Sequence, residues 1–177
     1  METRDWGAGK LDPFWNDEYK HLNYSIEPFN NTRDLQRWRR EGYVHPDSHF
    51  TGAMCDMRNP QPSWNSQLIR WAESKFGITD VGTSYYRMGT GVILPTHGDI
   101  YRKYIELFGC EVEHIIRVLV MLEDWKSGHY LELAGTAYAN WQAGDYFWWR
   151  GSTPHMAANI GTEKRYTIQI TGHLVDK

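Results

Sequence analysis

The sequence predicts a mainly β fold, a closed or double-sheet architecture such as a jelly roll, preceded by helices near the N-terminus. From Thr83 onward the chain consists of short runs rich in β-branched and aromatic residues, separated by turn residues. One long helical pattern is visible, and it precedes these runs. Several short strands with glycine-rich or polar connections are typical of sandwiches and jelly rolls.

The length and composition predict a single domain. The chain has 177 residues, of which 41% are hydrophobic and 15% aromatic, enough to bury a sizeable core. We expect one domain over residues 1–177, in which residues 1–82 form an N-terminal extension with a supporting helix and residues 83–173 form the β core. Prolines interrupt residues 1–50, so we expect loops, short helices and an edge strand there.

The long helical pattern is SWNSQLIRWAESKFG, residues 63–77. Its large apolar residues approximate one helical face, and they are Trp64, Leu68, Trp71 and Phe76. Ser63 is expected to cap the first turn, and Gly77 is expected to end the helix.

Eight runs after this helix predict strands because each is short, β-rich and bounded by turn residues. In order they are TSYYRM (83–88), GVILPTH (91–97), EHIIRVLVML (113–122), HYLELAG (129–135), YANW (138–141), DYFWWRG (145–151), HMAANI (155–160) and RYTIQITGHLV (165–175). The segment IYRKYIELFG, residues 100–109, instead predicts a short helix. It is either a lid over a site entrance or an ordinary surface helix.

Charge and hydropathy exclude several classes of partner. The formal net charge is -3, from 22 acidic and 19 basic residues spread along the chain, with no basic stripe for a phosphate backbone. The longest apolar run, IIRVLVML, is far shorter than the ~20 residues that span a bilayer. We therefore expect neither nucleic acid nor membrane as a partner. The N-terminal residues METRDWGAGK lack an apolar signal segment, and Cys55 and Cys110 suggest no disulfide framework, so we expect a cytoplasmic protein.

His97 and Asp99 are two residues apart, so in an extended backbone their side chains leave the same face and can share one metal ion. His155 could supply a third ligand from a later strand. Two imidazoles and one carboxylate on one face of an octahedron leave positions open for a chelating co-substrate and for oxygen, as in non-haem iron(II) oxygenases. A His-x-Asp pair also arises by chance, and a second one stands at His45 and Asp47.

Arg165 follows His155 by ten residues, on a strand with period-two alternation. Arg165, Thr167 and Gln169 fall on one face of this strand. If that face is solvated, the pattern has no further meaning. If it faces the interior, the guanidinium fork and the hydroxyl two residues on would form a clamp for a carboxylate.

These residues together resemble the 2-oxoglutarate- and iron(II)-dependent oxygenase superfamily, in which a His-x-Asp, a distant histidine and an arginine ten residues further on lie on a double-stranded β-helix. YYRMGTGVILPTHGD (85–99) looks like the prolyl-hydroxylase arrangement, and WQAGD (141–145) and HMAANIGTEKR (155–165) are similar to prolyl and aspartyl/asparaginyl hydroxylases. The resemblance covers about residues 83–173. It implies a cupin-like jelly roll.

The resemblance also implies the roles of individual residues. His97, Asp99 and His155 would hold Fe(II), while Arg165 and Thr167 would receive the distal carboxylate of the co-substrate 2-oxoglutarate, with O2 as the other co-substrate. Tyr86 matches the tyrosine that lines the co-substrate pocket, although an ordinary core tyrosine fits equally well.

Two other features leave alternatives open. An arginine on a strand such as that of Arg117 contacts the co-substrate in some relatives; alternatively Arg117 is a buried structural residue paired with Glu132 or Asp145. The segment SGHYLE (127–132) departs from the Gly-Gly-Glu-type motif of many relatives, which leaves the subfamily open.

The implied activity is hydroxylation of an amino-acid residue or a small metabolite, since halogenating relatives carry a small residue in place of Asp99. The alternative is a metal-binding, cupin-like module that binds a small ligand without oxygenase activity. A third interpretation is a structural jelly roll in which His97 and His155 never meet. The sequence does not identify the substrate, because substrate contacts in such folds come from variable loops.

Overall fold

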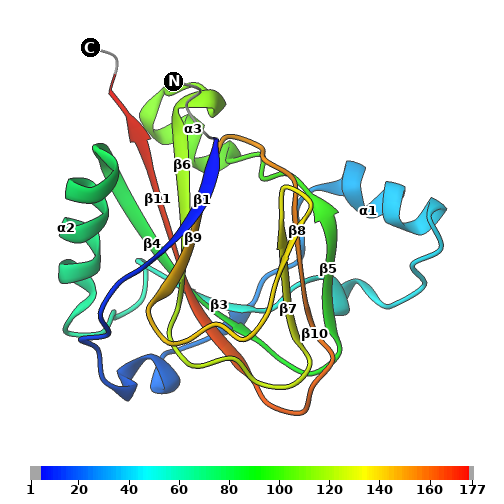
Figure 1. Cartoon of the computed structure of the whole chain (residues 1–177). Helices are drawn as coiled ribbons and strands as arrows, with labels where there is room; N and C mark the ends of the chain where they lie inside the picture. The colour runs from blue at the N-terminus through cyan, green and yellow to red at the C-terminus, as the bar shows by residue number, and fades with distance from the viewer. Residues whose placement is uncertain (1–4, 176–177) are drawn as a thin grey trace.

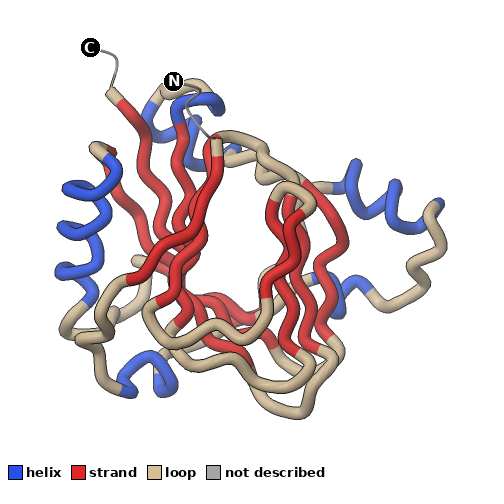
Figure 2. Tube along the Cα trace, viewed as in Figure 1, coloured by secondary structure: helices blue, strands red, loops and turns tan. Residues whose placement is uncertain are grey.

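The computed structural model describes residues 5–175 and consists of two antiparallel sheets that face each other (Figure 1, Figure 2). The larger sheet has the order β1 (Trp6–Lys10), β9 (Asp145–Arg150), β6 (Ile115–Met121), β11 (Arg165–Leu174), β4 (Ile78–Met88), β3 (Ala53–Asp56) and β2 (Ser25–Ile26). The smaller sheet has the order β5 (Val92–His97), β10 (His155–Asn159), β7 (His129–Leu133) and β8 (Thr136–Tyr138).

From β4 to β11 the chain crosses repeatedly between the two sheets: β4, β6, β9 and β11 belong to the larger sheet and β5, β7, β8 and β10 to the smaller one. This is the topology of a double-stranded β-helix, so the predicted cupin-like jelly roll with N-terminal helices is confirmed. Strands β1, β2 and β3, from the first 82 residues, extend the larger sheet at both edges.

Three α-helices and three short 3-10 helices accompany the sheets. They are α1 (Thr32–Arg40), α2 (Asn65–Phe76), α3 (Arg102–Phe108), η1 (Asp17–His21), η2 (Asp47–Phe50) and η3 (Val112–His114). Helix α2 covers the outer face of the larger sheet, α3 lies at one end of the barrel, and α1 projects beyond β5 (Figure 1). Within residues 5–175, no helix is long and apolar enough to cross a bilayer.

Strand alternation divides the apolar side chains into two cores. On β11, Ile168 and Ile170 point outward and pack with Leu68 of α2, in a cluster that also includes Val118 of β6. The second core lies between the sheets, where residues of both sheets meet: Tyr86, Met88, Leu119, Met121, Leu131, Leu133, Phe147, Trp149 and Ala157. The inner face of β11 contributes polar residues to this interior, which positions them for the site described below.

The structure corrects the predicted start of the long helix. Helix α2 begins at Asn65, its N-cap is Trp64, and that cap makes no side-chain hydrogen bond. Ser63 instead donates its hydroxyl and its backbone N–H to the carboxylate of Glu18, each over 2.8 Å. The predicted end is confirmed, because Gly77 adopts the left-handed conformation (φ 65) that terminates the helix.

The predicted strands coincide with observed ones, except that YANW is wrong. Strand β8 covers Thr136–Tyr138, because Ala134 and Gly135 both have positive φ and join β7 to β8 through a two-residue turn. Asn140, also at positive φ, then turns the chain away from the sheet. The segment 100–109 contains α3, as expected from its pattern.

Candidate metal centre

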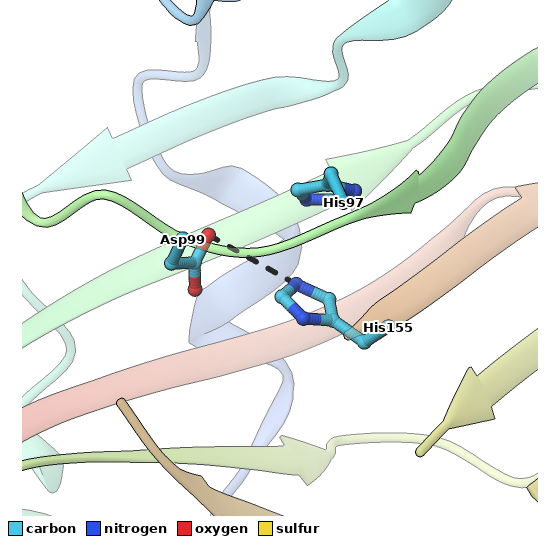
Figure 3. Close-up of side chains that lie close together, drawn as sticks. All are labelled: His97, Asp99 and His155. Carbon is cyan, nitrogen blue, oxygen red and sulfur yellow. Dashed lines mark ion pairs between the residues drawn. The ribbon is translucent and has the colours of Figure 1, made fainter. Parts of the chain in front are cut away.

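The smaller sheet brings the three predicted metal ligands together. His97 ends β5, Asp99 follows two residues later, and His155 begins β10, where it is the direct cross-strand partner of His97. Their ligand atoms all lie within 4.8 Å of one another, and His155 Nε2 is 3.9 Å from Asp99 Oδ1 (Figure 3). In the part of the chain that the structure describes, this is the only group of three or more such residues close enough to hold a metal ion.

Two turns that carry the ligands are fixed against each other. Ser152 donates its hydroxyl to the backbone oxygen of Asp99 over 2.7 Å, and the Tyr101 hydroxyl donates to the backbone oxygen of Gly151 over 3.2 Å. A Cβ atom at Gly98 would lie 2.6 Å from the backbone oxygen of Ser152, a distance that only glycine allows. The close approach explains a glycine between His97 and Asp99.

Backbone carbonyls set the orientation of both imidazoles. His97 Nδ1 lies 2.8 Å from the oxygen of Pro95, and His155 Nδ1 lies 3.0 Å from the oxygen of Thr153. Because a carbonyl oxygen only accepts, each Nδ1 carries the proton and donates it. Each Nε2 therefore keeps its lone pair for a metal ion.

Electrostatics favour the ligand form of these side chains. Burial lowers the pKa of His155 to about 4, since the cost of charging it outweighs the attraction of Asp99. Burial would by itself raise the pKa of Asp99, but the charge of Arg117 and the two histidines lower it to about 2. At neutral pH, His155 is thus neutral and Asp99 ionised, the forms that bind metal.

Arg117 reaches the site from β6. Its Nη2 lies 3.5 Å from Asp99 Oδ2, and its Nη1 donates to Gln169 Oε1 over 2.6 Å. The alternative pairing with Glu132 or Asp145 is wrong. Glu132 alternates with the inward-facing Leu131 and Leu133 on β7 and so points to the other face, and Asp145 lies at the far end of β9 from Trp149, the cross-strand partner of Arg117.

Arg165 is 4% exposed at the start of β11 and has no carboxylate of residues 5–175 within ion-pairing distance. Its Nη1 donates to the backbone oxygen of Tyr130 over 2.9 Å, its guanidinium lies 6.0 Å from the ring centre of Trp141, and its Nε has no partner. Burial lowers its pKa to about 10, so it remains charged at neutral pH. A buried cation without a counter-charge is costly and is best explained by an anionic ligand.

Two further predicted residues adjoin Arg165. Thr167 is fully buried, and its hydroxyl oxygen has no hydrogen-bond partner. Tyr86 is its neighbour across the β4–β11 pair, and the Tyr86 oxygen accepts a 2.6 Å hydrogen bond from the backbone N–H of Gly52. Burial raises the pKa of Tyr86 to about 12. Arg165 and Thr167 thus present donors without partners to the interior.

One cavity of about 720 Å³ connects all of these groups. Its lining includes the three candidate ligands and four residues of alternate positions on β11, namely Arg165, Thr167, Gln169 and Thr171. The polar face of β11 therefore points to the interior, the orientation that a carboxylate clamp requires.

Sequence reasoning missed the aromatic walls of the site. Trp149 lines the cavity, and its ring lies 4.5 Å from that of His155. Its position two residues after Phe147, on the same face of β9, is the sequence signal that could have identified it. Phe29 and Trp38 approach the ring of His97 edge-on, at 5.5 and 5.9 Å. Both come from the N-terminal segment, and no sequence pattern indicates those contacts.

The second His-x-Asp lies elsewhere and forms no such cluster. Asp47 pairs with Arg39, and the ring of His45 stacks on that of His49 at 5.9 Å.

Comparison with known proteins supports the fold. No protein-family model matches the chain, and no curated protein sequence matches it. A prolyl-4-hydroxylase of Pseudomonas putida is similar in structure, with a TM-score of 0.57 and 13% identity over 98% of this chain and 95% of that one. A viral collagen prolyl hydroxylase from Paramecium bursaria Chlorella virus-1, solved as a 2-oxoglutarate complex, has a TM-score of 0.53 and 11% identity over 98% and 97%. At such identities the likeness shows the fold, a cupin-like jelly roll.

Proposed function

We propose that this chain is an Fe(II)- and 2-oxoglutarate-dependent dioxygenase that hydroxylates an amino-acid residue or a small metabolite. The observation that carries the proposal is the presence, in one cavity, of a His-Asp-His group and a buried arginine without a carboxylate partner. The first suits a metal ion, and the second suits the far end of a dicarboxylic acid.

His97, Asp99 and His155 fit Fe(II) as its protein ligands. The 3.9 Å between His155 Nε2 and Asp99 Oδ1 is less than twice a metal–ligand distance of about 2.1 Å, so one ion can contact both atoms. Two nitrogens and one oxygen are the donor set of non-haem iron oxygenases. Arg117 holds Asp99 from the side by its ion pair, which keeps the carboxylate in one orientation.

Arg165 and Thr167 fit the distal carboxylate of 2-oxoglutarate, since each offers a donor without a protein partner. Tyr86 lines the same part of the cavity. Bound Fe(II), together with 2-oxoglutarate and O2, supplies the oxidising chemistry that converts a C–H bond to C–OH. The apolar and aromatic wall, including Leu119, Leu131 and Trp149, excludes water from the interior around those groups.

The proposal is tested by adding Fe(II) and 2-oxoglutarate to the protein under anaerobic conditions. Chelation of the metal by the 2-oxo acid should give a weak visible charge-transfer band. Succinate, which lacks the 2-oxo group, is the matched control and should give none. Absence of the band with 2-oxoglutarate would favour the metal-binding, cupin-like module without oxygenase activity. A screen of amino acids, peptides and nucleosides for succinate release would then identify the substrate class.

A further inference from the structure

A second hollow lies beside the metal centre, between α1 and the turns that carry Asp99 and Ser152. Its volume is about 460 Å³, and its lining includes Arg33, Arg37 and Arg40 together with Gly98, Ile100 and Ser152. The three arginines stand at positions i, i+4 and i+7, so one face of α1 presents them to the same groove. We call this hollow the arginine groove.

The arginine groove adjoins the cavity of the metal centre. Ile100, directly after the His-x-Asp motif, lines both hollows, and its side chain is 38% exposed between them. On the other side of Ile100, Arg102 and Lys103 of α3 are exposed and line the cavity. Cationic side chains therefore stand on both sides of the cavity mouth.

Two of the three arginines of the groove have no counter-charge among residues 5–175. Arg37 pairs with Asp34 at 3.2 Å and Glu41 at 3.8 Å, and it also donates to the backbone oxygen of Thr96. Arg33 and Arg40 are exposed and make no hydrogen bond or ion pair with residues 5–175. The chain as a whole has a net charge of -3, so this positively charged region differs in sign from the protein's net charge. Such a region attracts an anionic partner.

We propose that the arginine groove binds an acidic peptide segment, rich in aspartate or glutamate, next to the residue that enters the cavity. That the segment belongs to the substrate rests on the proposed function. Arg33 and Arg40 would receive its carboxylates, Ile100 would contact an apolar side chain, and Arg102 would hold a carboxylate beyond the mouth.

The lining favours a peptide over a single-stranded nucleic acid. Sites for single strands combine cations with aromatic rings on which bases stack, and the arginine groove has no aromatic residue among its lining residues. It does contain Asp34 and Asn31. Their side-chain oxygens can accept hydrogen bonds from the N–H groups of a peptide backbone, which a nucleic-acid backbone lacks.

The test uses a fluorescein-labelled peptide of alternating glutamate and glycine, and its glutamine counterpart, in fluorescence-anisotropy titrations of the full chain at low salt. The glutamate peptide should bind, and the glutamine peptide should bind at least about tenfold more weakly. Added salt should weaken the glutamate complex, because exposed charges are screened. Arg33→Glu/Arg40→Glu should raise the Kd for the glutamate peptide by about tenfold or more.

Arg70 and Lys75 provide a matched control. Both are exposed on α2, which covers the outer face of the larger sheet and lines neither hollow. Arg70→Glu/Lys75→Glu changes the net charge equally, and Lys75, like Arg40, lies in the last turn of its helix. It should leave peptide binding unchanged. Circular dichroism checks the fold, and Arg33→Gln/Arg40→Gln replaces the reversal variant if the latter does not fold.

Equal losses in the two double variants, or equal affinity for the two peptides, would overturn the inference. Tighter binding of a single-stranded oligonucleotide than of the glutamate peptide would assign the groove to nucleic acid instead. The anisotropy assay needs neither iron nor 2-oxoglutarate. Peptide binding without the anaerobic charge-transfer band would thus refute the proposed dioxygenase activity but support the arginine groove as a peptide site. The band without peptide binding would support the dioxygenase activity and refute the peptide site.

Discussion

At the scale of single residues, a guanidinium buried away from any carboxylate is the least expected feature of this interior. Arg165 is 4% exposed, and among residues 5–175 its guanidinium donates a hydrogen bond to the Tyr130 carbonyl and lies over the face of Trp141. Removing a charge from water costs several kcal/mol unless a counter-charge compensates. The residue is therefore better explained by an anion that binds there than by its contribution to folding.

Arg165→Ala should weaken 2-oxoglutarate binding while leaving metal binding nearly intact. Loss of a charge-assisted contact to a carboxylate costs about 1.5–3 kcal/mol, which corresponds to an increase in Kd of at least about tenfold. Titration of the anaerobic band with 2-oxoglutarate measures the Kd, and calorimetry with Mn(II) measures metal binding. If Arg117→Ala weakens 2-oxoglutarate binding and Arg165→Ala does not, the assignment of the carboxylate anchor is wrong.

His97→Ala should abolish tight iron binding and activity together, because Asp99 and His155 alone do not complete a three-ligand face. His45→Ala and Asp47→Ala are the controls, since this second His-x-Asp lies apart from the cluster. Both controls should keep metal content and activity within a few-fold. Metal analysis after reconstitution decides the matter: loss of iron in His45→Ala with retention in His97→Ala would move the site to the N-terminal region.

At the scale of elements, the metal centre depends on two turns in contact. The turn after β5 carries Gly98 and Asp99, the turn before β10 carries Gly151 and Ser152, and hydrogen bonds join them. A change in the spacing of these turns displaces Asp99 from His155. Local packing between these turns therefore sets the relative positions of the candidate metal ligands.

Gly98→Ala should lower metal affinity by about tenfold, a loss typical of displaced ligand support. Its Cβ would lie 2.6 Å from a backbone oxygen, so the turn must move. Gly89→Ala is the matched control, because nothing lies within 4 Å of a Cβ placed there. Calorimetric titration with Mn(II) compares the two variants, and equal affinities would show that the contact between the turns does not position Asp99.

Helix α3 should be protected from trypsin when metal and 2-oxoglutarate bind. The helix buries none of its residues, and Leu107 is 75% exposed. Its cleavable residues Arg102 and Lys103 line the cavity mouth. Slower cleavage there, with unchanged cleavage at Arg70 on α2, would support a lid. Unchanged cleavage at both places would identify α3 as a rigid surface helix.

Sequence patterns predicted elements well where periodicity is strong. The alternation of β11 separated Arg165 and Thr167 from Ile168 and Ile170, and the structure places these pairs on opposite faces. The pattern did not show that β8 starts two residues earlier than YANW, because that depends on two consecutive positive φ angles. Ser63 does not cap the helix, because its hydroxyl and its backbone N–H are donated to Glu18, distant in sequence, and the helix begins only at Asn65.

The candidate site residues likewise fall into those that a local sequence pattern indicates and those that depend on contacts between distant parts of the chain. The two-residue spacing predicted that His97 and Asp99 share a face, whereas the grouping of both with His155 rested on the resemblance to a known family. The partner of Arg117 was not predictable, since Arg117 lies on β6 of the larger sheet and Asp99 follows β5 of the smaller one, and only the packing of the two sheets brings them together. The contacts of Phe29 and Trp38 with His97 arise from how the N-terminal segment packs, which no local pattern encodes.

At the scale of the whole molecule, the cavity between the sheets links ligand binding to the stability of the fold. The candidate metal ligands lie on strands of the smaller sheet or directly after one, whereas Arg117 and Arg165 lie on strands of the larger sheet. A metal ion with a bound dicarboxylic acid would contact both sheets. Ligands that bind only the folded state stabilise it according to their concentration.

Mn(II) together with 2-oxoglutarate should therefore raise the thermal unfolding midpoint. At a ligand concentration one hundred times the Kd, the gain is about 2.7 kcal/mol in the free energy of unfolding. Scanning calorimetry measures the shift, with His155→Ala as the comparison. The variant should show no shift on addition of both ligands, and an equal shift in both proteins would show that stabilisation occurs at another place.

The course of β11 has a consequence for kinetics. The strand starts with buried Arg165 between the sheets and ends beside α3, where His173 contacts the hydroxyl of Tyr104 at 3.1 Å. A diacid anchored at Arg165 would thus lie deeper between the sheets than a reactant held beside α3. If the proposed function holds, a large second reactant held beside the exposed residues of α3 would cover the anchored diacid, so we expect the diacid to bind first. Such an enzyme would trap its first reactant for as long as the second remains, and excess of the second would inhibit by blocking entry.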